Sequence, residues 1–348
     1  MMHRRFPEVD VLRGMAALTV VLSHYLPYWN RYLENIWLVL PNSFGFYAVK
    51  LFFIISGFVI LITVRRCKRV VDFAVLRFSR LFPVYWASLA FVTLVQVFLF
   101  GDRFWAGGFI MNATMLQEFF GYDNFDEVYW SLTVEVAFYV QVCLLLAFGL
   151  SRRIRQVVFI WLFLTAIWVV TCHDIGLITR HDVVDSVGRD WLAHLCALDY
   201  SPYFSVGMLF FYGHSFGWKG RTFALMFLAF AVEFLLASWE GLALISAFSL
   251  LFALAISGRL RFLANKITIW LGSISYSLYL VHRNLGYHLL GWLHDHSFNA
   301  SVAICIAMVG ALVLATVFTF AVERPALRII RSFYDRFDHS TQRASGAF

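Results

Sequence analysis

The chain has 348 residues, of which 61% are hydrophobic and only 14% are charged. Soluble domains carry about 25% charged residues, and the mean hydropathy here is +0.73. The composition therefore excludes an ordinary soluble protein and predicts an integral membrane protein. The net charge of +7 does not indicate a nucleic-acid partner, because the basic residues gather in short loops between apolar runs. The five cysteines show no metal-type spacing, and we expect no metal.

Repeated apolar runs of about 20 residues predict an all-α fold, a polytopic membrane helix bundle of about ten transmembrane helices. We place the spans at residues 9–29, 44–64, 83–100, 129–150, 157–172, 198–216, 223–237, 242–256, 267–290 and 300–322. The seventh and eighth spans are short, and only four residues separate them. That spacing is compatible with a tight hairpin.

The charges of the loops alternate along the chain. Arginine and lysine dominate the segment before the first span and every second loop after it, whereas the remaining loops are acidic or mixed. The positive-inside rule then places both termini in the cytoplasm, which requires an even number of spans. We expect a single membrane domain over residues 1–338, with lipid contacts along it, and a mobile cytoplasmic tail over residues 339–348.

The first span carries two ionisable side chains, Arg13 and His24. They are eleven residues apart, so on a helix both lie on one face, separated by about 16 Å along the axis. Ionisable groups at membrane depth usually face a protein interior or a wet cavity. Two interpretations stay open at this point: a functional pair, or a cytoplasmic anchor together with an interfacial histidine.

Two basic features follow the first span. Lys50 lies near the start of the second span, where it can face a substrate or extend outward to the interface. Arg77 and Arg80, in the first large cytoplasmic loop, are three residues apart and share one face of a helix. Two guanidinium groups so placed suit a nucleotide or pyrophosphate, although a role in setting membrane topology is an equal alternative.

The fourth and ninth spans contain polar side chains at helical spacing. Glu135 lies inside the fourth span, four residues after Ser131, and is either a functional carboxylate or one half of a structural ion pair. In the ninth span Ser275, Tyr279 and His282 recur at i, i+4 and i+7. Such a polar stripe suits a hydroxylated substrate or a hydrated path, and it can equally join neighbouring helices.

Together these residues resemble the acyltransferase-3 family of bacterial membrane acyltransferases, in the form without an SGNH-type hydrolase domain. The resemblance covers nearly the whole chain, and its motifs fall in the expected order. They are Arg13-x10-His24, Phe52-Phe53-x-x-Ser56-Gly57-Phe58, Arg77-x-x-Arg80-x-x-Pro83, Trp130-Ser131-Leu132-x-x-Glu135, Ser275-Tyr276-x-x-Tyr279-Leu280-x-His282 and Glu323-x-Pro325.

The resemblance implies transfer of an acyl group, most often acetyl, from cytoplasmic acyl-CoA to a hydroxyl of a glycan or glycosylated acceptor at the bacterial inner membrane. Arg77 and Arg80 would then engage the CoA phosphates. We expect the catalytic residues to be His24, Glu135 and Arg13, and the substrate-binding residues to be Tyr279, His282, Ser275, Trp130 and Lys50.

In the predicted mechanism, the pantetheine arm enters a pore lined by the first, fourth and ninth spans. His24 deprotonates the acceptor hydroxyl or carries the acyl group itself. We expect Glu135 to fix the tautomer of His24, and Arg13 or Tyr279 to stabilise the oxyanion. The alternatives are a transporter or flippase for a polysaccharide precursor, and a transferase for another acyl group or an amine acceptor.

Overall fold

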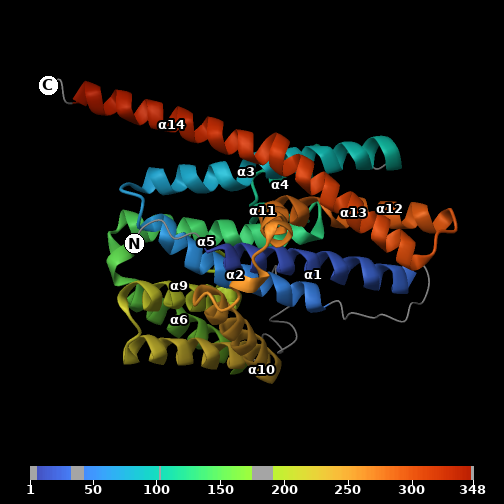
Figure 1. Cartoon of the computed structure of the whole chain (residues 1–348). Helices are drawn as coiled ribbons and strands as arrows, with labels where there is room; N and C mark the ends of the chain where they lie inside the picture. Colours follow the sequence, from blue (N-terminus) through green and yellow to red (C-terminus); the bar gives the residue numbers. More distant parts are fainter. Residues whose placement is uncertain (1–5, 33–42, 102, 175–190, 346–348) are drawn as a thin grey trace.

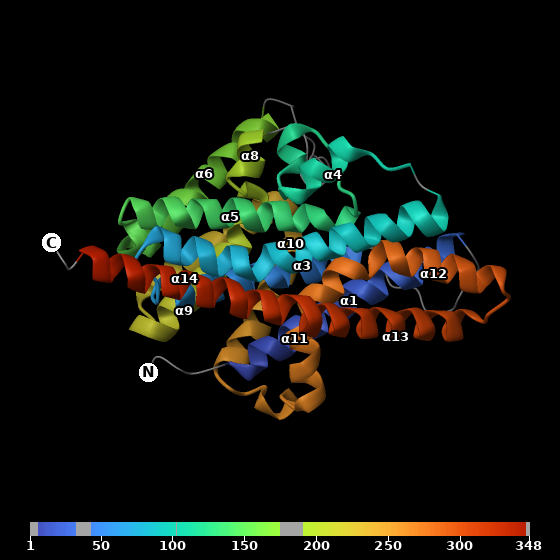
Figure 2. The same ribbon diagram turned by 90° about the horizontal axis from the view of Figure 1, so that it is seen from above.

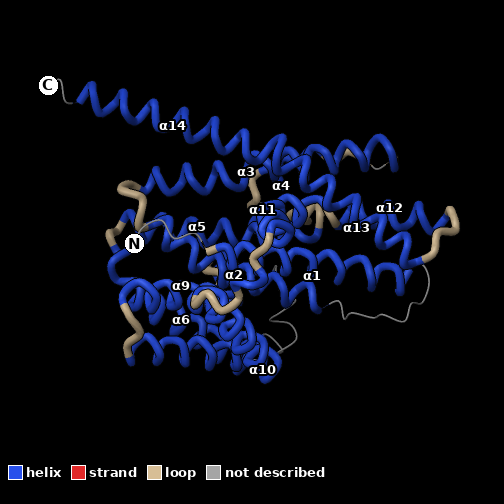
Figure 3. Tube along the Cα trace, viewed as in Figure 1, coloured by secondary structure: helices blue, strands red, loops and turns tan. Residues whose placement is uncertain are grey.

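The computed structural model describes residues 6–32, 43–101, 103–174 and 191–345. Within these ranges all regular secondary structure is helical, and short loops join the helices (Figure 3). The predicted all-α class is confirmed. The helices of the first half are α1 (Pro7–Tyr32), α2 (Ser43–Val64), α3 (Val70–Phe100), α4 (Ala106–Ala113), α5 (Trp130–Ala147) and α6 (Ile154–Asp174). Those of the second half are α8 (Trp191–Leu195), α9 (Ser201–Phe216), α10 (Gly220–Ile256), α11 (Lys266–Val281), α12 (Arg283–Asp295), α13 (Ala300–Phe318) and α14 (Arg324–Ser345).

The long helices pack side by side in one bundle (Figures 1 and 2). α3 and α14 lie along one side, α6, α9 and α10 lie along the opposite side, and α1, α2 and α5 lie between them. The closest helix pairs are α2 with α9 and α1 with α11. Seven of the described helices are long and apolar enough to cross a membrane. The count of ten spans and the cytoplasmic placement of the termini stay predictions from the hydropathy and the loop charges.

The helix of the third span begins thirteen residues earlier than predicted. α3 starts at Val70, so Arg77 and Arg80 belong to the same helix as the apolar run that begins at Pro83. The backbone N–H of Arg69 donates to Asp72 Oδ2 at 2.9 Å and holds the first turn of this helix. Because proline has no N–H, the helix lacks one backbone hydrogen bond at Pro83. The basic loop of the sequence-based prediction is therefore largely the first part of a long helix.

The seventh and eighth spans form a helical hairpin within α10. The backbone departs from helical geometry at Ala237 and Ser238. The ring of Phe210 in α9 lies 5.6 Å from that of Trp218, just before α10, and 5.3 Å from that of Phe252, near its end. A straight helix of 37 residues would separate these ends by about 50 Å. The chain therefore reverses at the break, as the short predicted connection allowed.

The ninth and tenth spans differ from the single helices predicted for them. The ninth is divided at His282 into α11 and α12, which run in different directions in Figure 1. The tenth continues from α13 through a π-helical turn, Thr319–Glu323, into α14. α14 extends as a helix to Ser345, into the segment that we predicted to be a tail. Both irregularities lie beside the polar residues described below.

α1 and α11 approach each other at a pair of glycines. A Cβ atom added to Gly14 would lie 2.8 Å from the backbone nitrogen of Gly272, so neither helix could come this close with a larger residue at the crossing. His24 follows Gly14 by ten residues, and His282 follows Gly272 by ten residues. Because the two helices run from this crossing in the same direction, the same rise of about 15 Å brings both histidines to one level.

Candidate active site

A cavity of about 320 Å³ lies between α1, α2, α3, α5, α11 and α14. Its walls combine apolar side chains, such as Phe52 and Leu81, with hydroxyl groups from α2, α5 and α11. The lining hydroxyl residues are Ser56, Thr63, Ser131, Tyr139, Ser275, Tyr276 and Tyr279. The first, fourth and ninth spans, which we predicted to line a pore, all contribute to this cavity, and α2, α3 and α14 contribute further walls. Entry of a pantetheine arm stays a prediction.

The cavity is strongly basic. Of its described lining residues, five are arginines and one, Glu135, is acidic. The arginines are Arg13, Arg66, Arg77, Arg80 and Arg331. Like charges so close to one another are stable only when water or an anion offsets them, and guanidinium groups bind phosphate oxygens well. The residue set therefore fits a polyanion.

Aromatic rings and a hydroxyl hold Arg77 in the cavity wall. Its guanidinium carbon lies 5.5 Å from the ring centre of Phe73 and 5.4 Å from that of Tyr139, and it donates to Thr63. Its buried Nε has no partner in the described part of the chain. A buried donor without a partner is unfavourable by about 1–3 kcal/mol. An anion in the cavity would satisfy it.

Arg80 is held differently from its neighbour. It pairs with Glu323, which is buried in the π turn and also accepts a bond of 3.2 Å from Ser277. The predicted pair therefore does line one cavity, as the three-residue spacing indicated. The ion pair neutralises much of the charge of Arg80, which leaves Arg77 as the more available cation.

Glu135 lies in the cavity wall, one turn beyond Ser131. It accepts hydrogen bonds from Tyr139 Oη at 2.5 Å and from Ser56 Oγ at 3.1 Å. None of the contacts described for Glu135 or for His24 joins the two residues, so the structure does not provide the carboxylate–imidazole pair of the predicted mechanism. Glu135 shares the cavity with Arg13 instead.

A hydrogen bond between α5 and α11 joins two residues of the cavity wall. The Oγ of Ser131 and the Oη of Tyr279 are 2.7 Å apart, and Tyr279 Oη also donates to the carbonyl of Val128 at 2.7 Å. Ser275, one turn before Tyr279, donates to the carbonyl of Gly272 at 2.9 Å. Two of the three stripe residues thus line the cavity, while the third lies beyond its end.

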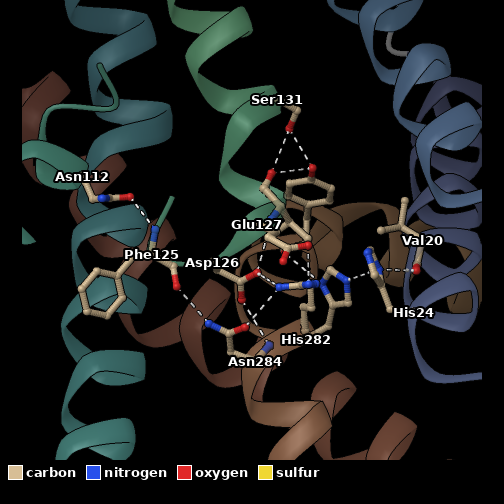
Figure 4. A network of polar contacts seen from close by, with 12 residues as sticks. Val20, His24, Asn112, Phe125, Asp126, Glu127, Ser131, His282 and Asn284 are labelled. Atoms are coloured by element: carbon tan, nitrogen blue, oxygen red, sulfur yellow. Dashed lines mark hydrogen bonds and ion pairs between the residues drawn. The ribbon is translucent and has the colours of Figure 1, made fainter. Parts of the chain in front are cut away.

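That third residue, His282, contacts His24 (Figure 4). The Nε2 of His282 is 3.1 Å from the Nδ1 of His24, which is also 2.9 Å from the carbonyl of Val20. His282 is fully buried, whereas His24 is partly exposed. The side chain of Tyr279 is part of the cavity wall, and its carbonyl lies 2.8 Å from the Nδ1 of His282. One residue therefore separates the cavity from the histidine pair.

An acidic segment before α5 surrounds the start of α12 (Figure 4). The buried carboxylate of Asp126 accepts from the backbone of Asn284 at 3.2 Å and lies 3.5 Å from Arg283. Burial raises the pKa of the Asp126 carboxyl to about 6, in spite of the nearby guanidinium. Arg283 also pairs with Glu127. These carboxylates offset the cation next to the histidine pair.

Like His282, two other residues predicted to bind substrate lie outside the described lining of the cavity. Lys50 is buried, and its Nζ is 3.3 Å from Glu233 Oε1, an oxygen that also accepts from Tyr203 at 2.7 Å. Trp130 packs in an aromatic cluster, with its ring centre 5.7 Å from that of Phe46. Neither belongs to the described lining of the cavity.

Arg66, Arg331 and Thr63 also line the cavity, although no pattern in the sequence marks them as site residues. Arg66 follows Arg65 directly in a basic loop, and the sequence does not indicate that Arg66 lines the cavity whereas Arg65 lies over the rings of Phe211 and Phe216. Arg331 lies on α14, whose packing against α3 has no signature in the sequence. The Glu-x-Pro motif did contain a signal, since Glu323 pairs with Arg80.

The fold is a bundle of long apolar helices that surrounds a basic cavity, as in a multi-pass membrane protein. A sequence profile described as an acyltransferase domain, Acyl_transf_3, matches residues 6–320, and the chain therefore belongs to the acyltransferase-3 family. Nodulation protein 10 of Rhizobium leguminosarum bv. viciae is 25% identical in an alignment that is 368 positions long and covers 96% of each chain. ORF330 of Acidianus two-tailed virus, named provisionally as an acetyltransferase, is 25% identical over 139 residues, 40% of each chain. No solved structure matches the chain significantly.

Proposed function

We propose that the protein transfers an acyl group, acetyl in the first instance, from cytoplasmic acyl-CoA to a hydroxyl of a cell-surface or exported glycan, in the inner membrane of a bacterium. The observation that carries this proposal is the cavity with five arginines and a single carboxylate at the interior of an acyltransferase-family fold. The full-length relative in a bacterium supports the proposed location.

The donor end of the proposed site is the part of the cavity next to α3 and α14. The phosphates of CoA meet Arg77, Arg66 and Arg331, and the unpartnered Nε of Arg77 gains an acceptor there. The volume of about 320 Å³ is at the lower limit of small-molecule pockets. It suits the slender pantetheine arm and a short acyl group, with the nucleotide end at the cavity mouth.

In the proposed reaction, His24 acts as the general base. It takes the proton of the acceptor hydroxyl, and the oxygen forms a bond to the thioester carbonyl carbon. The carbon–sulfur bond then breaks, and the CoA sulfur leaves with the proton returned from the imidazole. For the thioester to reach His24, the acyl end passes the wall in which Ser131 and Tyr279 are hydrogen-bonded.

The acceptor reaches His24 from the side away from the cavity. There the rings of Tyr28 and Tyr287 are stacked at 4.1 Å, and the ring centre of Tyr287 lies 6.4 Å from that of His24. Aromatic faces edged with hydroxyl groups offer both apolar contact and hydrogen bonds. This combination supports a ring-shaped, hydroxylated acceptor such as a sugar.

Membranes that contain the protein test the proposal directly. With radiolabelled acetyl-CoA, we expect label in the glycan fraction that mild alkali releases, because an ester is alkali-labile and an amide is not. Succinyl-CoA in parallel tests the choice of acyl group, and membranes with the His24→Ala variant provide the background. The absence of both transfer to glycan and thioester cleavage with every acyl-CoA tested would contradict the proposal. Alkali-stable label would indicate an amine acceptor.

A further inference from the structure

The orientation of His282 determines where its proton lies. Its Nδ1 is 2.8 Å from the carbonyl of Tyr279 and 3.1 Å from that of Leu278. A carbonyl oxygen only accepts hydrogen bonds, so Nδ1 carries the proton. In the neutral imidazole, Nε2 then holds a lone pair. Because Nε2 is the atom that faces His24, His282 presents an acceptor to its neighbour.

The same reasoning fixes the tautomer of His24. Its Nδ1 has two neighbours, the carbonyl of Val20 at 2.9 Å and the Nε2 of His282 at 3.1 Å, and both are acceptors. Nδ1 of His24 is therefore the protonated nitrogen, and Nε2 is left with a lone pair. No hydrogen bond to that Nε2 exists in the described residues. His24 thus has one reactive nitrogen, and it is the one that points away from His282.

The break between α11 and α12 supplies a place for positive charge. Leu278 and Tyr279 belong to the last turn of α11, and the carbonyls of a last helical turn form the negative end of the helix dipole. When Nε2 of His24 gains a proton, the charge spreads through the Nδ1–H bond to His282, whose other nitrogen contacts these carbonyls. In a medium that excludes water such an interaction is strong.

Two further contacts hold His282 at the break. Tyr25, the residue after His24, donates from its Oη to the carbonyl of His282 at 2.8 Å. Gly286, one turn into α12, lies so close to the ring of Tyr25 that a side chain there would collide with it. α1 therefore holds both histidines, one through its own backbone and one through Tyr25.

We propose that His282 is the positioning residue of the reaction. It fixes His24 as the tautomer with Nδ1 protonated, so that Nε2 of His24 is the base, and it shares the charge that forms when Nε2 takes the proton of the acceptor hydroxyl. That proton is returned to the leaving sulfur, so His282 is unchanged after each turnover. The inference rests on the proposed function, and it assigns to a second histidine the role that the sequence assigned to Glu135.

Two conservative substitutions separate this role from packing. In His282→Gln, the amide oxygen can reach the place of Nε2 and accept from His24. In His282→Asn, the shorter amide reaches only the place of Nδ1, so the acceptor is lost while a polar side chain remains. We expect His282→Asn to lower kcat by about 100-fold, the scale of general-base assistance, with KM for acetyl-CoA unchanged. We expect His282→Gln to stay within about fivefold of the parent.

The matched control is His296→Gln, at the exposed end of α12, for which we expect parental kcat. Thermal unfolding in detergent shows whether each variant is folded. A His282→Asn protein with kcat within twofold of the parent would overturn the inference, and so would equal loss in the Asn and Gln variants. These outcomes are distinct from failure of the proposed function, which the absence of both glycan labelling and thioester cleavage with the parent protein would reveal.

Discussion

The two ends of the active site are built in different ways. At the arginine-lined cavity, the key cations come from one helix at i and i+3, and the partners of Arg77 lie within α2, α3 and α5. At the histidine pair, the contact joins residues 258 positions apart in the chain. We expect the cavity to tolerate the loss of one arginine, because several cations line it and would share the binding of one anion. The histidine pair depends on one nitrogen at one place, so we expect its variants to show the larger effects.

The largest expected effect is that of His24→Ala. Removal of the only proposed base should lower kcat by about 1,000-fold, within the range for general-base catalysis. Binding of acetyl-CoA, measured by isothermal titration, should stay within twofold, since His24 does not belong to the described lining of the cavity. A parallel loss of CoA affinity would show that the two ends are not separate.

A smaller effect on a different parameter is expected from Arg77→Ala combined with Arg80→Ala. Loss of phosphate contacts should raise KM for acetyl-CoA by about 10–100-fold, with a weaker dependence of KM on salt than in the parent. The steady-state rate at several salt concentrations measures both. Arg153→Ala, an exposed arginine of another basic segment, is the control, and unchanged KM in the double variant would remove CoA binding from this pair.

Lys50 provides a test of stability at an ion pair that belongs neither to the described lining of the cavity nor to the histidine pair. Lys50→Met leaves the buried carboxylate of Glu233 without its cation, which should destabilise the fold by about 3–5 kcal/mol. Lys50→Met with Glu233→Gln should recover most of that loss. The melting temperature in detergent measures both, and the KM for substrate should not change in the double variant. A raised KM there would restore Lys50 to the substrate-binding residues.

The smallest effect is expected from Ser131→Ala. Tyr279 keeps its bond to the carbonyl of Val128, so the variant loses one hydrogen bond worth about 1 kcal/mol. Because the acyl end must pass this place, we expect kcat to rise or fall by no more than about fivefold, and longer acyl-CoA donors to gain relative to acetyl-CoA. The relative rates with acetyl- and butyryl-CoA measure this, and an unchanged ratio would place the acyl path elsewhere.

Local spacing explains which parts of the site the sequence could predict. The pairing of Arg77 with Arg80 on one face, and of Ser131 with Glu135, follows from the helical repeat, and the structure places all four side chains in one cavity. The approximate bounds of some apolar helices, such as α2 and α5, were also predictable, because about 20 apolar residues in succession have few alternatives in a membrane.

Contacts between distant helices explain the rest. Nothing in the sequence ranks His282 above Glu135 as the neighbour of His24, since both are polar residues inside apolar spans. The close approach of Gly14 and Gly272 sets the register of α1 against α11, and this register brings His282 next to His24. The break at His282 is equally hidden, because it depends on the hydroxyl of Tyr25 and not on a proline or glycine at the break itself.

The π turn between α13 and α14 is a place where a change of helix direction would move the residues that follow it. Glu323, in this turn, forms an ion pair with Arg80. Arg331, eight residues further along the chain in α14, lines the cavity. Eight residues of helix span about 12 Å, so a tilt of about 10° at the turn would move Arg331 by about 2 Å. That displacement is enough to make or break a contact with a phosphate. A small tilt of α14 would thus change which cations line the cavity without a rearrangement of the other helices.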